Sequence, residues 1–248
     1  IDTTWNRVKG GKAIGELVTK IATEFNFNEP AASIPNLAKA YSMIQALDEN
    51  HWAPLKSAEI KEIIAACSGL YLEAVAQNQE TTPGSNIKLK LEAINRSTSP
   101  IQLLSVITLP NEIKTVQNLE LKNNVLKSIN LDLRLPETIK YTQPYWLQES
   151  GTEGMYTVNN QKNIGIPDII REVKVVFNLK ISAIEIPFER TVVYKYNDDV
   201  KGEIYNYLDI VPEVTTAIVD NVLLFKDNKV KYVGVKIRTG KDAVKGNL

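Results

Sequence analysis

Imidazole and thiol side chains, which often supply the bases, nucleophiles and metal ligands of hydrolytic enzymes, occur once each in the 248 residues, as His51 and Cys67. A metal site needs a cluster of imidazole, thiolate or carboxylate ligands, and an acyl-transfer triad usually needs a histidine beside its nucleophile. His51 has no acidic or thiol partner at a suitable spacing, so we interpret it as a loop histidine packed beside Trp52. The sequence therefore does not predict a self-contained catalyst of these kinds.

The other reactive groups also favour structural interpretations. Cys67 falls on an apolar helical stripe, which predicts a buried small hydrophobe and not a reactive thiolate. Asp198, Asp199 and Glu203 offer oxygen ligands for calcium, but they lack the alternating spacing of a calcium loop, so a polar turn between strands is expected. No pair among the 29 acidic residues is marked out for glycoside hydrolysis. An independent glycosidase that uses scattered carboxylates stays an alternative.

Aromatic residues in an irregular stretch, residues 141–166, are the one group that favours a binding site. They are Tyr141, Tyr145, Trp146 and Tyr156. Aromatic faces with polar tips suit sugar rings and partner surfaces, and long ordered loops are often functional. Two interpretations stay open: the loop binds carbohydrate, or Trp146 closes one end of a β-sandwich core.

The elements that would position these residues begin with helices. Apolar residues recur at the i, i+3, i+4, i+7 spacing from Lys12 to Phe25. A second helix is expected to begin at Ser33-Ile34-Pro35. A third is expected after Pro54, with Ser57 as its N-cap, and to continue through Val75. Three helices joined by short loops indicate a helical connector domain over residues 1–80.

Strand periodicity replaces helical periodicity near residue 81, after which apolar and polar residues alternate. The absence of a helical pattern between these segments predicts an antiparallel, Ig-like β-sandwich over residues 81–211, and hence an α+β chain. The expected strands are 87–93, 103–109, 128–135, 173–182 and 185–196.

The last segment, residues 212–248, predicts two further strands, Thr215–Phe225 and Lys231–Thr239, with a turn at Asp227-Asn228. Because an isolated hairpin is marginally stable, these strands either join the preceding sandwich or begin a further one that is cut off. We expect the second arrangement. The chain also opens at Ile1 without a signal segment, so either a leader was removed or this is a piece of a longer protein. The cut-off strands at the far end favour the second alternative.

Composition restricts the partners. Lys+Arg and Asp+Glu number 29 each, so there is no basic excess of the kind that nucleic-acid binding normally needs, and no polybasic membrane patch. No apolar run approaches the roughly 20 residues that span a bilayer. A hydrophobic content of 44% is ordinary for a globular chain with a sizeable core.

Long stretches of the sequence resemble the segment that follows the catalytic domain in long bacterial PIG-L (LmbE-like) deacetylases. The resemblance spans essentially the entire chain. It is carried by residues 1–11 (IDTTWNRVKGG), 63–76 (IIAACSGLYLEAVA), 83–97 (PGSNIKLKLEAINRS), 144–156 (PYWLQESGTEGMY), 192–205 (VVYKYNDDVKGEIY) and 210–216 (IVPEVTT).

The resemblance implies an accessory region of a zinc-dependent N-acetylglucosaminyl deacetylase, exported to the periplasm or beyond. In that family the zinc site uses an Ala-His-Pro-Asp-Asp type motif and a distant histidine, both N-terminal to this region. No His-Pro-Asp-Asp string occurs here, so no catalytic residue carries over and zinc is expected only in the absent catalytic domain. The expected partners are that domain and a glycan.

Overall fold

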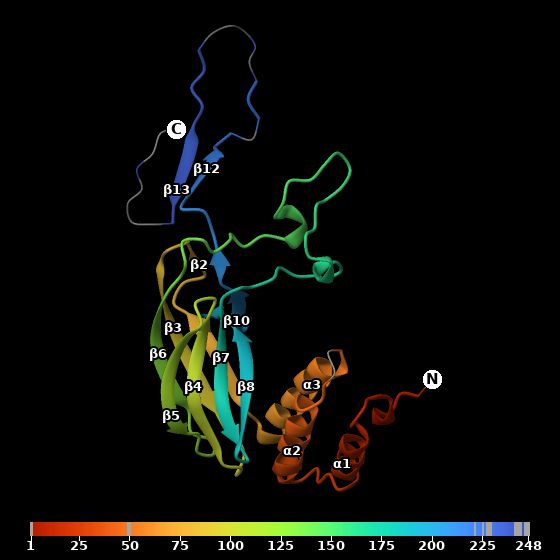
Figure 1. The fold of residues 1–248 in the computed structure, drawn as a ribbon. Coiled ribbons are helices and arrows are strands. Elements are labelled where there is room, and N and C mark those ends of the chain that lie inside the picture. The colour runs from red at the N-terminus through yellow and green to blue at the C-terminus, as the bar shows by residue number, and fades with distance from the viewer. Residues whose placement is uncertain are drawn as a thin grey trace. The chain divides into compact units, whose positions relative to one another are not determined.

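The structure, a computed structural model, describes residues 2–48, 51–220, 222–224, 226, 230–240 and 245. Three helices come first, α1 (Lys12–Thr23), α2 (Ile34–Gln45) and α3 (Trp52–Ser68), and strands follow (Figure 1). The expected mixed α+β composition, with antiparallel strands in sheets, is confirmed. The short helical turns are η1 (Trp5–Arg7), η2 (Pro30–Ser33), η3 (Tyr145–Leu147) and η4 (Gln161–Asn163).

The strands are assigned to sheets of five, four, two and two members among the described residues, in the orders β10-β9-β1-β3-β6, β5-β4-β7-β8, β11-β2 and β12-β13. Their bounds are β1 Tyr71–Ala76, β2 Glu80–Thr81, β3 Asn86–Ile94, β4 Ile101–Leu109, β5 Ile113–Glu120, β6 Lys127–Arg134, β7 Lys174–Ile181, β8 Ile184–Thr191, β9 Val193–Asp198, β10 Gly202–Tyr207, β11 Asp209–Ile210, β12 Val214–Ile218 and β13 Val235–Thr239.

The chain divides into two compact units. The first comprises Ile1–Val75, Leu89–Leu131 and Val173–Val192, and the second comprises Ala76–Lys88, Asp132–Glu172 and Val193–Leu248.

In the first unit, the four-stranded sheet has a core of large side chains aligned across its strands. Phe177 of β7 lies opposite Val106 of β4 on one side and Phe188 of β8 on the other. Leu179 similarly lies between Leu103 and a buried isoleucine of β8. Such cross-strand pairs are what stabilise a sheet face, and the alternation of apolar residues along these strands is what selects the buried face.

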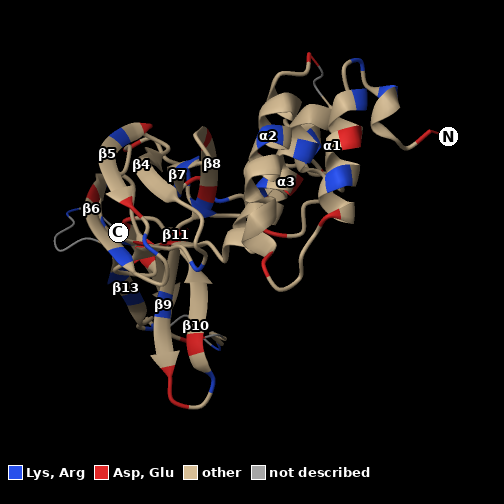
Figure 2. Ribbon diagram, turned by 90° about the horizontal axis from the view of Figure 1, so that it is seen from below, with Lys and Arg blue, Asp and Glu red and all other residues tan. Residues whose placement is uncertain are grey.

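The helices of the first unit bury their apolar stripes against one another and against this sheet. Ile14 and Ile44 are almost fully buried on α1 and α2. The ammonium group of Lys61 on α3 donates to the carbonyl oxygen of Pro187 on β8 at 3.1 Å. Basic and acidic residues both occur along the helices (Figure 2).

The predicted bounds of the third helix were wrong at both ends. It begins at Trp52 rather than near Ser57, whose buried hydroxyl instead accepts a hydrogen bond from the Gln45 amide at 2.7 Å. It ends at Ser68 because Gly69 adopts a left-handed conformation, with φ of 53°, that caps the helix. Residues 71–75, expected to continue the helix, belong to β1.

The expected strand at 185–196 is two strands, since β8 ends at Thr191 and β9 begins at Val193. Val192, which is buried, donates its backbone N–H to the carbonyl of Val173 where the chain leaves the four-stranded sheet.

In the terminal segment, β12 and β13 pair antiparallel as expected, although both strands are shorter than expected. The Asp227-Asn228 turn lies outside the described residues.

Candidate functional site

The candidate site belongs to the second unit and is built on β11, a strand of only two residues. Asp209 and Ile210 pair in parallel with Glu80 and Thr81 of β2. The N–H of Asp209 donates to the carbonyl of Gln79 at 2.9 Å, which extends this pairing. Backbone hydrogen bonds therefore hold β11 in place although it is short.

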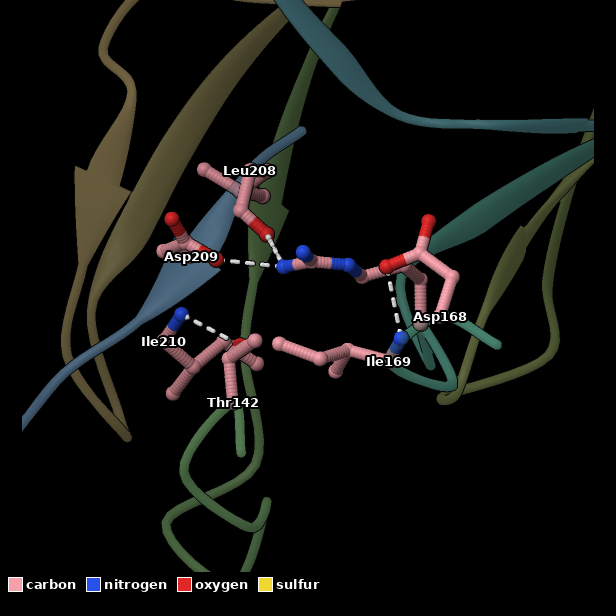
Figure 3. A network of polar contacts seen from close by, with 7 residues as sticks. Thr142, Asp168, Ile169, Leu208, Asp209 and Ile210 are labelled. Atoms are coloured by element: carbon pink, nitrogen blue, oxygen red, sulfur yellow. Dashed lines mark hydrogen bonds and ion pairs between the residues drawn. The ribbon is translucent and has the colours of Figure 1, made fainter. Parts of the chain in front are cut away.

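A loop of residues 143–170, which contains most of the irregular stretch, is fastened to β11 at both ends. Near its start, the N–H of Thr142 donates to the carbonyl of Ile210, and the N–H of Ile210 donates to the Thr142 hydroxyl, both at 2.8 Å. Near its end, Arg171 donates to the carboxylate of Asp209 and, at 3.4 Å, to the carbonyl of Leu208 (Figure 3). The loop of residues 143–170 therefore begins and ends beside the same short strand, β11.

The Arg171 side chain is only 14% exposed. Its guanidinium carbon lies 4.9 Å from the centre of the Tyr207 ring, at a cation–π distance. Its Nε is buried and has no hydrogen-bond partner among the described residues. Because a buried guanidinium is stable only when paired, the Asp209 carboxylate is what makes this position tolerable.

Contacts inside the loop give it a defined conformation. The N–H of Gly165 donates to the Tyr145 hydroxyl at 3.1 Å, which joins η3 to the segment after η4. Thr152 and Met155 exchange backbone hydrogen bonds, and the hydroxyl of Thr157 donates to the Ser150 carbonyl. The loop is therefore organised by its own residues as well as by its anchors.

The structure brings together two of the four aromatic residues that the sequence singled out. The rings of Tyr145 and Trp146 meet edge to face, with centroids 4.9 Å apart, and both are half-buried. Tyr141 and Tyr156 are 47% and 68% exposed. The irregular stretch, residues 141–166, thus contains both a packed aromatic pair and exposed rings.

Sequence reasoning missed a second aromatic group of this unit, on the hairpin of β9 and β10. Tyr205 and Tyr207 occupy alternate positions of β10 and share a face with Lys195 of β9, because Tyr205 lies opposite Lys195. The Lys195 ammonium lies 5.8 Å from the Tyr205 ring centre and 3.3 Å from the Glu203 carboxylate. The alternation of tyrosines in "YNY", residues 205–207, was the available signal.

Hydrogen bonding alters the acidity of this hairpin. The hydroxyl of Tyr205 donates to the Glu203 carboxylate, and this bond, with Lys195 beside it, lowers the pKa of Glu203 below its ordinary value. The backbone N–H groups of Lys201 and Val200 likewise lower the pKa of Asp198. Asp198 therefore closes the hairpin turn, in agreement with the polar-turn interpretation of this acidic segment.

The two rare reactive residues lie in the first unit. The His51 ring meets the Trp52 ring edge to face at 4.7 Å, which agrees with the packing interpretation. Cys67 is half-buried on α3, and burial raises the pKa of its thiol. Within the described ranges, no three His, Cys, Asp or Glu side chains are grouped so that they could hold a metal ion. No helix in the described part of the chain is long and apolar enough to cross a membrane.

Comparisons with known proteins add little. No family model matches the sequence, and no curated protein matches it. Among solved structures, the sporulation control protein Spo0M of Bacillus subtilis is similar over 49% of this chain and 47% of its own, at 10% identity and a TM-score of 0.27. The Pseudomonas fluorescens alkylpurine DNA glycosylase AlkC, bound to DNA containing an abasic site analog, is similar over 71% of this chain and 50% of its own. The sequence identity is 10% and the TM-score is 0.22.

The chain spans about half the length of each of these two proteins. At such TM-scores neither similarity supports an assignment of function.

Proposed function

We propose that this chain is a non-catalytic accessory region of a PIG-L-like, zinc-dependent N-acetylglucosamine deacetylase, exported from a bacterial cell. The sequence resemblance supports this family. The carrying observation is the attachment of residues 143–170 at both ends to β11, through Thr142 and Arg171. A long segment held in this way extends a surface without needing a catalytic group of its own.

The partner of this region is the catalytic domain of the same protein, which would hold the zinc ion. The role proposed here is to support the catalytic domain or to shape the side of its substrate cleft. The strands of the sandwich-like part would adopt an Ig-like arrangement.

We also propose that β12 and β13 begin a further sandwich. Every residue of both strands is exposed, including Ile218, Val235 and Ile237. An isolated two-stranded ladder is marginally stable, so apolar side chains on it are expected to be covered by additional strands.

The test uses the longer deacetylase that the proposal implies. Replacing residues 143–170 with a short Gly/Ser linker should reduce deacetylation of an N-acetylglucosamine oligosaccharide, and leave deacetylation of a single N-acetyl sugar unchanged. Replacing Asp199–Lys201, at the tip of the β9–β10 hairpin, is the matched control. The accessory role would be contradicted if the loop variant and the parent had equal activity on both substrates. It would also be contradicted if removing residues 83–248 left both activities unchanged.

A second candidate function is carbohydrate binding by the loop itself. The edge-to-face Tyr145–Trp146 pair favours it, because rigid aromatic rings with polar tips are suited to sugar faces. Tryptophan fluorescence of this chain should then change saturably with amino-sugar oligosaccharides, and the change should be lost in Trp146→Phe. If Trp146→Ala unfolds the chain and Trp146→Phe keeps the fluorescence change, Trp146 is a packing residue instead.

A further inference from the structure

The helical part of the first unit contains a cavity that the proposed function does not use. Its volume is about 250 Å³, and it lies between residues 3–8 and the first two turns of α3. Pockets for drug-sized ligands usually measure roughly 300–1,000 Å³. This cavity is therefore of a size suited to a single ring.

Three apolar side chains line the cavity: Trp5, Val8 and Trp52. Trp5 is seated by glycines of the neighbouring helix, since a Cβ at Gly15 would lie 3.1 Å from the Trp5 Cβ, and one at Gly11 would lie 2.2 Å from the Trp5 carbonyl oxygen. These glycines allow η1 to approach α1 closely. The Trp5 wall is thus a consequence of the fold.

Two cations also line the cavity. The Arg7 guanidinium carbon lies 5.5 Å from the centre of the Trp52 ring, at a cation–π distance, and Lys56 lies about one helical turn after Trp52. A guanidinium is well suited to pair with a carboxylate through two parallel hydrogen bonds. Aromatic faces next to such donors select a ligand that has both a ring and an anionic group.

Two acids close in sequence to the lining residues, Asp2 and Glu59, already have partners. The carboxylate of Asp2 accepts hydrogen bonds from the N–H and the hydroxyl of Thr4, at 2.8 and 2.7 Å. The Glu59 carboxylate, on a side chain that is 60% exposed, pairs with the Lys56 ammonium at 2.8 Å. Among the residues that the structure describes, Arg7 and Lys56 are the charged side chains that line the cavity, and Lys56 is already paired with Glu59.

We propose that this cavity binds a single pyranose ring that carries a carboxylate. The indole ring of Trp5 contacts a face of the sugar, the Trp52 ring holds the Arg7 guanidinium beside it, and Arg7 pairs with the sugar carboxylate. The threonine hydroxyls in the lining are suited to the sugar hydroxyls. This site is independent of the aromatic loop and of the deacetylase relationship.

The test is a titration of the 248-residue chain with glucuronate, followed by tryptophan fluorescence, with glucose as the neutral ligand of matched ring size. A saturable change is expected with glucuronate, and added salt should weaken the binding because the recognition is partly ionic. Arg7→Gln should weaken it about tenfold, the loss that corresponds to one charge-assisted hydrogen bond. Lys20→Gln, which removes an exposed cation from α1 outside the cavity, is the matched control and should leave binding unchanged.

Two further variants separate this cavity from the aromatic loop. Gly15→Ala favours the helix but pushes on Trp5, so it should weaken glucuronate binding without unfolding the chain. Trp146→Phe should leave glucuronate binding intact. The proposal is overturned if glucuronate and glucose bind equally, if Arg7→Gln binds as the parent does, if the signal disappears in Trp146→Phe, or if no saturable change occurs.

Discussion

Thr142 and Ile210 exchange two hydrogen bonds of 2.8 Å although 68 residues separate them, one between backbone groups and one to the threonine hydroxyl. This pair holds the first end of the loop, and the Arg171–Asp209 ion pair holds the second. Asp209 and Ile210, which bind the two ends of the loop, are the two residues of β11. The position of residues 143–170 therefore depends on a strand of two residues.

Thr142→Val should therefore loosen the loop. Valine keeps the shape of threonine but leaves the partly buried N–H of Ile210 without its acceptor, so the free energy of unfolding should fall by about 1–2 kcal/mol. Urea unfolding measures the loss, and limited proteolysis should cut the loop faster than in the parent. Thr157→Val is the matched control inside the loop, since the Thr157 hydroxyl makes only an exposed hydrogen bond. Equal losses in both variants would show that the anchor contributes nothing special.

The Arg171–Asp209 pair should contribute more than surface ion pairs of this chain. Arg171 is 14% exposed, but Asp209 is 35% exposed, so solvent screening reduces the contribution of a charged hydrogen bond to roughly 1–2 kcal/mol. A double-mutant cycle with Arg171→Met and Asp209→Asn measures the coupling energy by urea unfolding. The same cycle on Lys12 and Glu16, an exposed pair at 4.0 Å, should give below about 0.5 kcal/mol. Similar coupling energies in the two cycles would refute this ranking.

Glu203 should titrate at lower pH in the folded chain than in the unfolded chain. The Tyr205 hydroxyl, and secondarily Lys195, favour the ionised carboxylate and lower its pKa. Because the pKa of Glu203 is lower in the folded state, its carboxylate stabilises the fold at pH values above its ordinary pKa. This stabilisation disappears as the pH falls through the pKa of the folded state. NMR titration should show the Glu203 pKa rising toward its ordinary value in Tyr205→Phe.

Asp198 is the internal control for that titration. Its pKa is lowered by backbone N–H groups of Lys201 and Val200, which Tyr205→Phe does not remove. If the pKa values of both carboxylates rise in the variant, the hairpin has changed conformation and the Tyr205 hydroxyl is not the cause.

Elements with strong periodicity could be predicted from the sequence. The apolar stripes beginning at Lys12 and Ile34 predicted α1 and α2, and clean alternation predicted β3, β6 and β7. β5 was missed because five of its eight residues are exposed and the other three are only half-buried, so it shows little alternation between apolar and polar positions. β10 was missed because three of its six residues are Tyr205, Asn206 and Tyr207, whose polar groups conceal the strand pattern.

The candidate site could be predicted only in part. The concentration of aromatic residues singled out Tyr145 and Trp146, which do contact each other. The anchors could not be found, because a hydrogen bond from Thr142 to a backbone group 68 residues away leaves no sequence pattern. Arg171 and Asp209 are likewise 38 residues apart, and only the three-dimensional path of the chain brings them together.

The end of α3 was the clearest error, and it yields a prediction. Leu70, Tyr71, Ala74 and Val75 continue the helical spacing, yet Gly69 ends the helix because its φ of 53° is a conformation that residues with a Cβ rarely adopt. The first strand then starts at Tyr71, and the N–H of Arg96 donates to the Ser68 carbonyl at 3.1 Å. The signal in the sequence was a glycine directly after an apolar run.

Gly69→Ala should destabilise the chain more than a substitution at a glycine with a similar conformation and open surroundings. A Cβ at Gly69 would lie 2.8 Å from the Cβ of Arg96, so backbone strain of about 1–2 kcal/mol is joined by a steric clash. Gly202→Ala, at φ of 77° with nothing within 4 Å, carries the strain alone. Urea unfolding should show a larger loss for Gly69→Ala. If the two losses are equal, the chain relaxes around Arg96 and conformational strain alone ends the helix.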